Sequence, residues 1–292
     1  MSPASSLLAC LLTVVLAPAQ TLSGVIDVHA HADPDGMARS IDAIDLAKLA
    51  KSRGMRGLVL KNHYESTAVL AYLVNKEVPG LELAGGIALN RPVGGINPAA
   101  VEWMAKVKGG FGRIVWMPTF DSEHHVTSQK ETRPFVSVSR NGQLLPEVEQ
   151  VLALIAANNM VLATGHSSPA EVLMLIRAAK RAGVKQIIVT HAINAFVGMS
   201  TEQMKEAAGL GAFLEFVWVR PGTPAVRQTA DAIRAVGPAS AILSSDLGQA
   251  ANPLHPDGLM AFFQALREAG LSEADIALMS KTNPARLLGW KQ

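Results

Sequence analysis

Two kinds of hydrophobic pattern alternate along the chain. Short apolar runs rich in Val, Ile and Leu are typical of buried strands, whereas longer segments with apolar residues every three or four positions are typical of helices. The opening strand is predicted within 24–33, and the later strands at 57–61, 83–89, 113–117, 160–164, 186–190, 212–219 and 241–245. The predicted helices between them are 41–53, 66–75, 98–108, 146–158, 169–182, 201–208 and 229–236.

The alternation of strand and helix predicts the fold. Alternation implies parallel pairing through crossover connections, and a count of eight strands favours closure into a barrel. The predicted fold class is therefore α/β, a single (β/α)8 TIM barrel, with an open doubly wound sheet as the alternative. A small insertion follows the fourth strand, where Asn141-Gly142 lies between alternating polar and apolar residues and predicts a hairpin within 121–145.

Length and charge narrow the function. A chain of 292 residues, 49% of them hydrophobic, is long enough for one barrel of about 250 residues. The formal net charge is only +2, and Lys and Arg form no basic block with interleaved aromatic residues. We therefore expect one barrel domain over 20–292 that acts on a small-molecule substrate and binds no nucleic acid.

The N-terminal segment resembles a signal peptide. Its first 23 residues carry no charge, residues 7–17 form an apolar run too short to span a bilayer, and Ala17-Pro18-Ala19 fits a cleavage site. We expect a signal peptide at 1–19, a periplasmic or secreted protein, and no stable membrane association after cleavage. A start codon placed too far upstream of a cytoplasmic protein is the alternative. Cys10, the only cysteine, lies in this segment in a loose lipoprotein-like box, so the mature chain would have no disulfide or thiolate ligand.

Two histidines end the opening strand in the stretch GVIDVHAHAD. Because strand side chains alternate between faces, Asp27, His29 and His31 are predicted on one face, opposite the apolar residues between them. The two rings are either ordinary core or surface histidines or two ligands of one metal ion, because neutral imidazole is the commonest metal-binding side chain.

Further polar residues follow later strands. Active sites of such barrels gather at the carboxyl ends of the strands, and a lone residue there is often an ordinary loop or turn residue. With His29 and His31, the side chains of His166, His191 and Asp246 would place four imidazoles and a carboxylate at one mouth of the barrel. This set matches one or two divalent ions such as zinc, whereas the same cluster without a compensating charge would be costly to desolvate. The residues at these later strand ends are Lys61, His63, His166, His191 and Asp246.

The ordered set of these residues resembles the amidohydrolase superfamily. Its members carry His-x-His on strand one, His on strands five and six, and Asp on strand eight. The tail KTNPARLLGW also resembles an Asn-Pro-Ala-x-Leu-Leu-Gly ending common in that superfamily, so the resemblance covers most of 24–290. It implies a metal-dependent hydrolase with one or two divalent metals, zinc above all. The implied metal ligands are His29, His31, His166, His191 and Asp246.

The resemblance also implies a reaction and its alternatives. The metal would activate a water for hydrolysis of an amide, lactone or other ester, and Asp246 would be the catalytic proton acceptor. Asp27 would orient a ligand imidazole from behind. The alternatives are a mononuclear metal-dependent decarboxylase and, from another class, an exported solute-binding protein with two lobes.

The chain departs from the superfamily pattern at strand four. Many binuclear members place a carbamylated Lys or a Glu there to bridge two metals, whereas this strand reads RIVWMPTFDSEHH. Lys61 is therefore left with three roles: a carbamate bridge between metals, a cation for an acidic substrate group, or a rim salt-bridge partner. His63 is expected to contact substrate. Glu215 faces either the lumen, behind the ligands, or a helix outside, and the residues Asp121, His124 and His125 are expected in a lid or at the surface.

Overall fold

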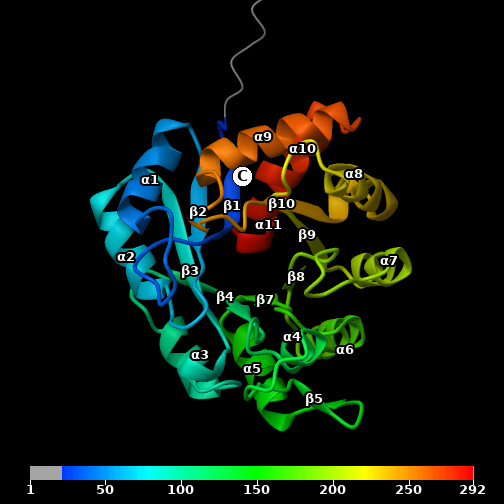
Figure 1. The fold of residues 1–292 in the computed structure, drawn as a ribbon. Helices are drawn as coiled ribbons and strands as arrows, with labels where there is room; N and C mark the ends of the chain where they lie inside the picture. The colour runs from blue at the N-terminus through cyan, green and yellow to red at the C-terminus, as the bar shows by residue number, and fades with distance from the viewer. Residues whose placement is uncertain (1–21, 292) are drawn as a thin grey trace, which may run out of the picture.

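The computed structural model describes residues 22–291, which fold into a barrel (Figure 1). Within this range eight parallel strands pair in the order β1-β2-β3-β4-β7-β8-β9-β10, and the helices that connect them lie outside the ring. The strands are β1 (Ile26–Ala30), β2 (Gly57–Leu60), β3 (Glu82–Ala88), β4 (Gly112–Trp116), β7 (Val161–Ala163), β8 (Gln186–Val189), β9 (Phe213–Val217) and β10 (Ala241–Ser244).

The barrel closes between its first and last strands. The backbone N–H of Asp246 donates to the carbonyl of His29 at 2.8 Å, and the N–H of His31 donates to the carbonyl of Leu247 at 3.0 Å. Closure confirms the predicted single (β/α)8 barrel and contradicts the open doubly wound sheet. It also brings the histidines of the first strand end beside the aspartate of the last.

Local capping explains where several helices begin. The Asp42 side chain accepts the first free N–H groups of α1, and Ser168 forms a capping box with Glu171 at α6. Helix α8 begins at Pro224 rather than at the predicted 229, because a proline at the first helical position starts the helix ahead of its apolar face. The main helices are α1 (Ala43–Ser52), α2 (Ala68–Glu77), α3 (Pro98–Ala105), α5 (Pro146–Ala157), α6 (Pro169–Arg181), α7 (Thr201–Gly209), α8 (Pro224–Val236) and α9 (His255–Glu268). The shorter ones are η1 (Arg91–Val93), η2 (Pro238–Ser240), α10 (Glu273–Ala277), the π-helical η3 (Leu278–Thr282) and α11 (Asn283–Leu288).

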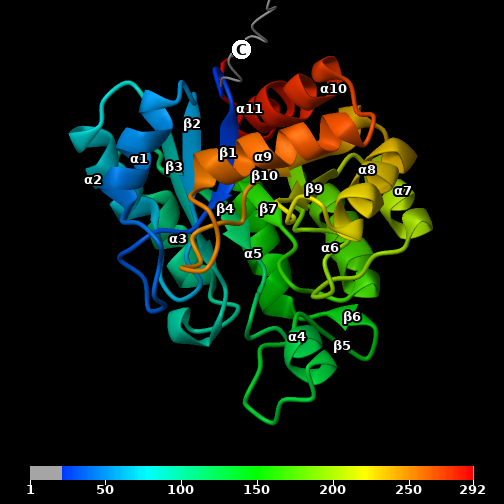
Figure 2. The same ribbon diagram turned by 45° about the horizontal axis from the view of Figure 1, so that its top comes forward.

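Apolar side chains pack in two clusters. The larger one fills the layer between strands and helices, and the smaller one lies inside the barrel, where Trp116 and Ile188 meet Leu287 and Leu288 of α11. Figure 2 shows α11 at one end of the barrel and the segment after β4 at the other. One end is thus plugged, and the carboxyl ends of the strands are left for a site. None of the helices formed by residues 22–291 has the length and apolar character needed to cross a membrane.

Strand β1 breaks the regular alternation that its sequence predicts. Its register shifts between Asp27 and Ala30, and Val28 packs with Trp116 in the interior cluster together with the apolar residues of the lumen. Asp27 accepts from the backbone N–H of His29 at 3.1 Å and of Ser245 at 2.9 Å. The prediction that Val28 lies opposite the two histidines is therefore wrong, because a bulge turns Val28 and His29 to the same side.

The insertion after β4 contains the predicted hairpin and one helix that was not predicted. Strands β5 (Ser139–Arg140) and β6 (Gln143–Leu144) pair around Asn141-Gly142, whose φ angles of 52° and 75° suit a tight hairpin turn. Helix α4 (Glu123–Ser128) precedes them, capped by Ser122. The predicted signal peptide at 1–19 and Cys10 lie outside the described residues.

Candidate metal centre

The side chains of His29, His31 and Asp246 meet at the mouth of the barrel. Nε2 of His29 and Nε2 of His31 each lie 3.0 Å from the same carboxylate oxygen, Oδ1 of Asp246. One ligand atom from each of the three residues lies within 4.8 Å of the other two. Both imidazoles are buried, whereas the Asp246 side chain is 23% exposed, so the cluster is open on the side of the aspartate.

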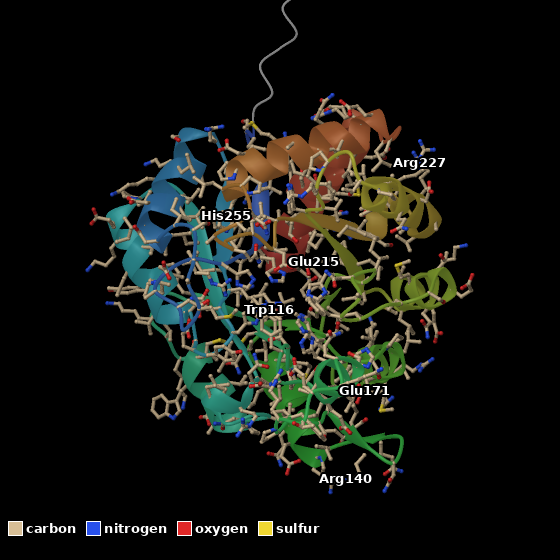
Figure 3. All side chains as sticks on the ribbon, in the orientation of Figure 1. Trp116, Arg140, Glu171, Glu215, Arg227 and His255 are labelled. Carbon is tan, nitrogen blue, oxygen red and sulfur yellow. The ribbon has the colours of Figure 1, made fainter. Side chains whose placement is uncertain are left out.

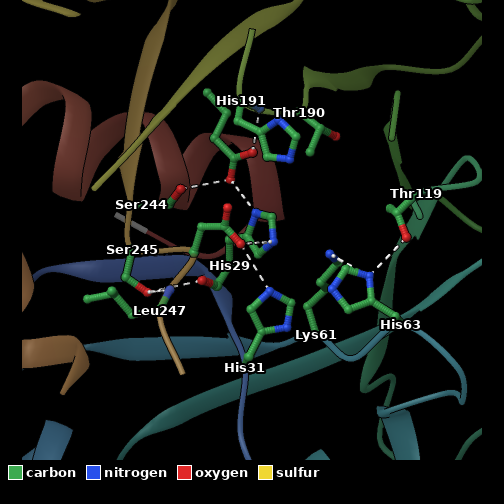
Figure 4. A network of polar contacts seen from close by, with 12 residues as sticks. His29, His31, Lys61, His63, Thr119, Thr190, His191, Ser244, Ser245 and Leu247 are labelled. Atoms are coloured by element: carbon green, nitrogen blue, oxygen red, sulfur yellow. Dashed lines mark hydrogen bonds and ion pairs between the residues drawn. The ribbon is translucent and has the colours of Figure 1, made fainter. Parts of the chain in front are cut away.

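Glu215 holds this cluster from behind. Its Oε1 lies 3.0 Å from Nδ1 of His29 and accepts from the Ser244 hydroxyl at 2.7 Å, and its Oε2 accepts from the backbone N–H of His191 at 3.0 Å. Figure 4 labels the three partners, His29, Ser244 and His191, and Figure 3 places Glu215 in the middle of the barrel. Of the two orientations considered for Glu215, the structure shows the one into the lumen.

Burial and neighbouring charges shift the pKa values of His29 and His31 in opposite directions. Burial lowers the pKa of His29, but the carboxylates of Asp246 and Glu215 outweigh it and raise that pKa to about 9. Burial and the charge of Lys61 hold the pKa of His31 well below its ordinary value. In the metal-free chain, the two carboxylates therefore favour the charged form of His29.

The structure brings the other two predicted histidine ligands to the same mouth. The ring of His191 stacks on His29 with centroids 6.1 Å apart, and the ring of His166 lies 4.9 Å from that of His191. Burial lowers the pKa of both rings, that of His191 to about 4. Both side chains are neutral imidazoles beside the three-residue cluster, with Nδ1 unpaired within the described chain.

The backbone at this mouth adopts conformations that L-residues rarely take. His191 and Asp246 have φ angles of 26° and 51°, in a region where backbone strain often accompanies function. Gly165, just before His166, also has a positive φ, and a Cβ there would lie 2.2 Å from the Met117 carbonyl oxygen. A Cβ on Gly248 would lie 2.3 Å from the His31 carbonyl oxygen. Glycine at both positions lets the loops approach the strand ends closely.

Lys61 and His63 lie next to the three-residue cluster. The Lys61 side chain is buried, with Nζ 3.4 Å from Nδ1 of His63, and within the described chain no carboxylate pairs with it. Burial lowers the pKa of Lys61 to about 8, although Asp246 and Glu215 oppose this shift. The His63 ring stacks 4.9 Å from His31, and its Nδ1 lies 2.9 Å from the Thr119 hydroxyl. The rim salt bridge considered for Lys61 is therefore wrong.

Three aromatic side chains that were not predicted as site residues pack against the ring of His166. Phe196 stacks on the His166 ring at 5.2 Å, and His125 and Phe120 lie 5.2 and 5.4 Å from it. His125 is buried, and the Ser122 hydroxyl that caps its helix donates to the His166 carbonyl at 2.8 Å. His125 is therefore not a surface residue, and its place in a lid stays a prediction. A Ser followed by a run of helix-compatible residues at 122–128 was the available signal for α4.

Asp27 does not have the role expected of it. It binds two backbone N–H groups, of His29 and Ser245, and no imidazole. The carboxylate that contacts a ligand imidazole from behind is Glu215. Asp27 instead stabilises the bulge in β1, and burial raises its pKa to about 6.

The donor set fits a divalent cation. Two Nε2 atoms converge on one carboxylate oxygen, and a neutral His31 that donates to this oxygen leaves its Nδ1 buried and unpaired. A cation between these atoms would take the place of the proton on His29. Two imidazole nitrogens with a carboxylate oxygen are ligands that Zn²⁺ prefers, and the contact of His29 with Glu215 is typical of metal-binding histidines.

Comparison with protein families gives one match. A model described as a family of unknown function, DUF6282, matches residues 24–215. The chain belongs to the DUF6282 family. No match was found among curated proteins. The matched span of this DUF6282 protein contains all the predicted site residues except Asp246.

Solved structures share the fold of this DUF6282 protein. An amidohydrolase from Pseudomonas aeruginosa is 13% identical with a TM-score of 0.64, covering 91% of this chain and 95% of that chain. A Burkholderia multivorans amidohydrolase with bound zinc is 14% identical with a TM-score of 0.63, covering 91% and 99%. An organophosphorus hydrolase from Deinococcus radiodurans is 13% identical with a TM-score of 0.59, covering 91% and 92%. The resemblance to the amidohydrolase superfamily is confirmed at the level of the fold.

Proposed function

We propose that this protein is a metal-dependent hydrolase whose reaction takes place at the cluster of His29, His31 and Asp246. The observation that carries the proposal is the convergence of two buried Nε2 atoms on one carboxylate oxygen, each at 3.0 Å. The shared fold with an amidohydrolase that binds zinc supports it. The two-lobed shape of a solute-binding protein does not agree with the single barrel of residues 22–291.

The residues of the chain have distinct roles in this proposal. His29, His31, Asp246 and the adjacent His166 and His191 would hold one or two divalent ions, with zinc the best fit to the donors. When bound, the metal would act as a Lewis acid that activates water and polarises the substrate oxygen. Asp246, exposed on one side, accepts the proton of the attacking water and returns it to the leaving group.

Lys61 keeps two of its three roles. In a binuclear site its neutral amine would react with CO2 to give a carbamate and a proton, and the carbamate would supply the bridging anion. In a mononuclear site its ammonium would bind an acidic group of the substrate, beside His63. The buried position of Nζ, 3.4 Å from Nδ1 of His63, is compatible with both.

The bond that is cleaved belongs to a small-molecule amide, lactone or other ester.

We propose in addition that the enzyme is exported to the periplasm or secreted, on the basis of the uncharged apolar start of the sequence. Mass spectrometry of the protein from its native host tests the export proposal. A mature N-terminus near Gln20 supports it, and an intact Met1 or Ser2 in the soluble cytoplasmic fraction contradicts it.

A substrate panel tests the proposed reaction. Zinc-loaded protein is incubated with esters, lactones, amides and aromatic carboxylic acids, and the released acid, amine or CO2 is measured. Hydrolysis of one of the first three classes, absent in Asp246→Asn, supports the proposal. Release of CO2 from a carboxylic acid without hydrolysis identifies the decarboxylase alternative instead.

A further inference from the structure

A pocket of about 210 Å³ lies beside the metal centre, between β9 and α8. It reaches the proposed site at His191 and Glu215, and its other walls come from the loop after β8, the end of β9 and the second turn of α8. Figure 1 shows that β9 and α8 follow each other on one side of the barrel. We call this space the Trp218 pocket. Its volume is below the roughly 300–1,000 Å³ of a pocket for a whole drug-sized ligand, so it suits one part of a substrate.

Two residues that line the Trp218 pocket carry polar atoms that lack partners. Nε1 of Trp218 and Oγ1 of Thr229 are buried and make no hydrogen bond within the described chain. Buried polar groups are nearly always hydrogen-bonded, and leaving one unpaired costs about 1–3 kcal/mol. Trp218 can only donate, and Thr229 can donate or accept. Both side chains therefore call for an oxygen acceptor in the pocket.

The charges around the Trp218 pocket indicate that the acceptor is neutral. Among the described residues, no Lys or Arg lines the pocket. The one acidic residue there, Glu215, already binds His29, Ser244 and the His191 backbone. Within the lining an anionic group would therefore meet Glu215 and no Lys or Arg, and a cationic group would find no free carboxylate. Most of the remaining lining, including Ile193 and Val217, is apolar, and the side-chain amides of Asn194 and Gln228 are the polar exceptions; Oδ1 of Asn194 accepts from the backbone N–H of Phe196.

We propose that the Trp218 pocket binds a neutral, oxygen-bearing part of the substrate, such as an amide or hydroxyl group on a short apolar stem. Trp218 and Thr229 donate to its oxygen, and the apolar wall contacts the stem. This inference rests on the proposed hydrolase function, because it assigns the pocket to the substrate that reacts beside His191. It makes Trp218 and Thr229 specificity-determining residues.

A titration with two small probes of similar shape tests the Trp218 pocket. Propionamide is neutral and carries a carbonyl acceptor, whereas n-propylammonium carries only donors. Each is added to full-length, zinc-loaded, 15N-labelled protein, and the indole N–H signals of the four tryptophans are followed by NMR. The Trp218 signal is assigned by its loss in Trp218→Phe. Propionamide should shift this signal saturably, with a Kd on the order of 10 mM for so small a ligand, and n-propylammonium should leave it unchanged.

Two variants make the result specific. Thr229→Val keeps the shape of the side chain but removes the hydroxyl, so it should weaken propionamide binding several-fold. Trp103→Phe, which changes a 69% exposed residue outside the pocket, should bind like the wild type. The absence of a saturable Trp218 shift, equal shifts with both probes, or unchanged affinity in Thr229→Val would each overturn the proposal and leave water as the occupant.

The outcome is separable from the fate of the proposed function. If the zinc-loaded protein hydrolyses a member of the panel but Trp218 does not respond, the pocket assignment is wrong and the hydrolase stands. If Trp218 responds in a protein that neither binds zinc nor hydrolyses any substrate, the pocket is a binding site and the hydrolase proposal is wrong.

Discussion

Glu215 and His29 are 186 positions apart in the sequence, yet Oε1 of Glu215 lies 3.0 Å from Nδ1 of His29. The contact directs Nε2 of the ring toward Asp246, and it fixes the tautomer with its proton on Nδ1 once a metal occupies Nε2. A glutamate in the middle of β9 thereby determines how a histidine on β1 binds its ligand.

Replacement of Glu215 by Gln should weaken metal binding. The amide oxygen can still accept from the ring, but the negative charge that makes the imidazole a better ligand is lost. Zinc affinity should fall by about 10–100-fold, as for other groups that support a metal-binding histidine, measured by competition with a chromogenic chelator. Glu102→Gln, at an exposed residue that pairs with Lys106, is the matched control and should bind zinc like the wild type. Unchanged zinc affinity in Glu215→Gln would show that the contact is only structural.

His29→Ala and Asp246→Asn should both abolish turnover, for different reasons. Loss of His29 removes a ligand nitrogen, so the purified variant should contain less metal. Asp246→Asn keeps an oxygen ligand and removes the proton acceptor, so the rate should fall by about 10²–10⁴-fold with most of the metal retained. Metal content and rate are measured on the same samples. Wild-type activity in either variant contradicts its assigned role.

The expectation for Lys61 depends on the number of metals. If metal analysis gives two equivalents per chain, the apoprotein should recover activity faster with added bicarbonate, and Lys61→Ala should lose one metal. If it gives one equivalent, Lys61→Ala should keep that metal and show a raised KM, because the substrate loses its cation. Two metals retained in Lys61→Ala with unchanged kinetics would exclude both roles.

Gly165→Ala should destabilise the protein, because the added Cβ would collide with the backbone beside the site. The added Cβ would lie 2.2 Å from the Met117 carbonyl oxygen, at a φ of 61° that alanine rarely adopts. The free energy of unfolding should fall by at least about 2 kcal/mol, as measured by urea denaturation. Gly209→Ala is the control, because Gly209 is in α7 with open space around its Cβ position and no positive φ. A similar loss of stability in both variants would contradict the close approach at Gly165.

The periodicity of the sequence was sufficient to predict the eight strands and the barrel, because each strand is buried on both faces and each main helix has an apolar face. The histidines and Asp246 could also be located, because the active sites of such barrels lie at the carboxyl ends of the strands. The sequence alone could not place Phe120, His125 and Phe196, which come from loops whose path depends on tertiary contacts such as the bond between Ser122 and His166.

Two features of β1 and β9 also required the structure. Simple alternation assigned Asp27 to the face of the histidines, but its bonds to the backbone of His29 and Ser245 create a bulge that alternation cannot include. Glu215 could face either side of β9 in the sequence, because an acid is compatible with the lumen only when partners are present. The partners, His29, Ser244 and the His191 backbone, are distant in the chain.

The most direct test of the metal centre is a zinc titration of the metal-free wild-type chain, compared with His31→Ala. We expect tight binding of at least one zinc per wild-type chain, hydrolytic activity that rises in proportion to bound zinc, and loss of both in the variant. Equal zinc binding by His31→Ala, or no stoichiometric zinc binding by the wild type, would contradict a metal centre at His29, His31 and Asp246.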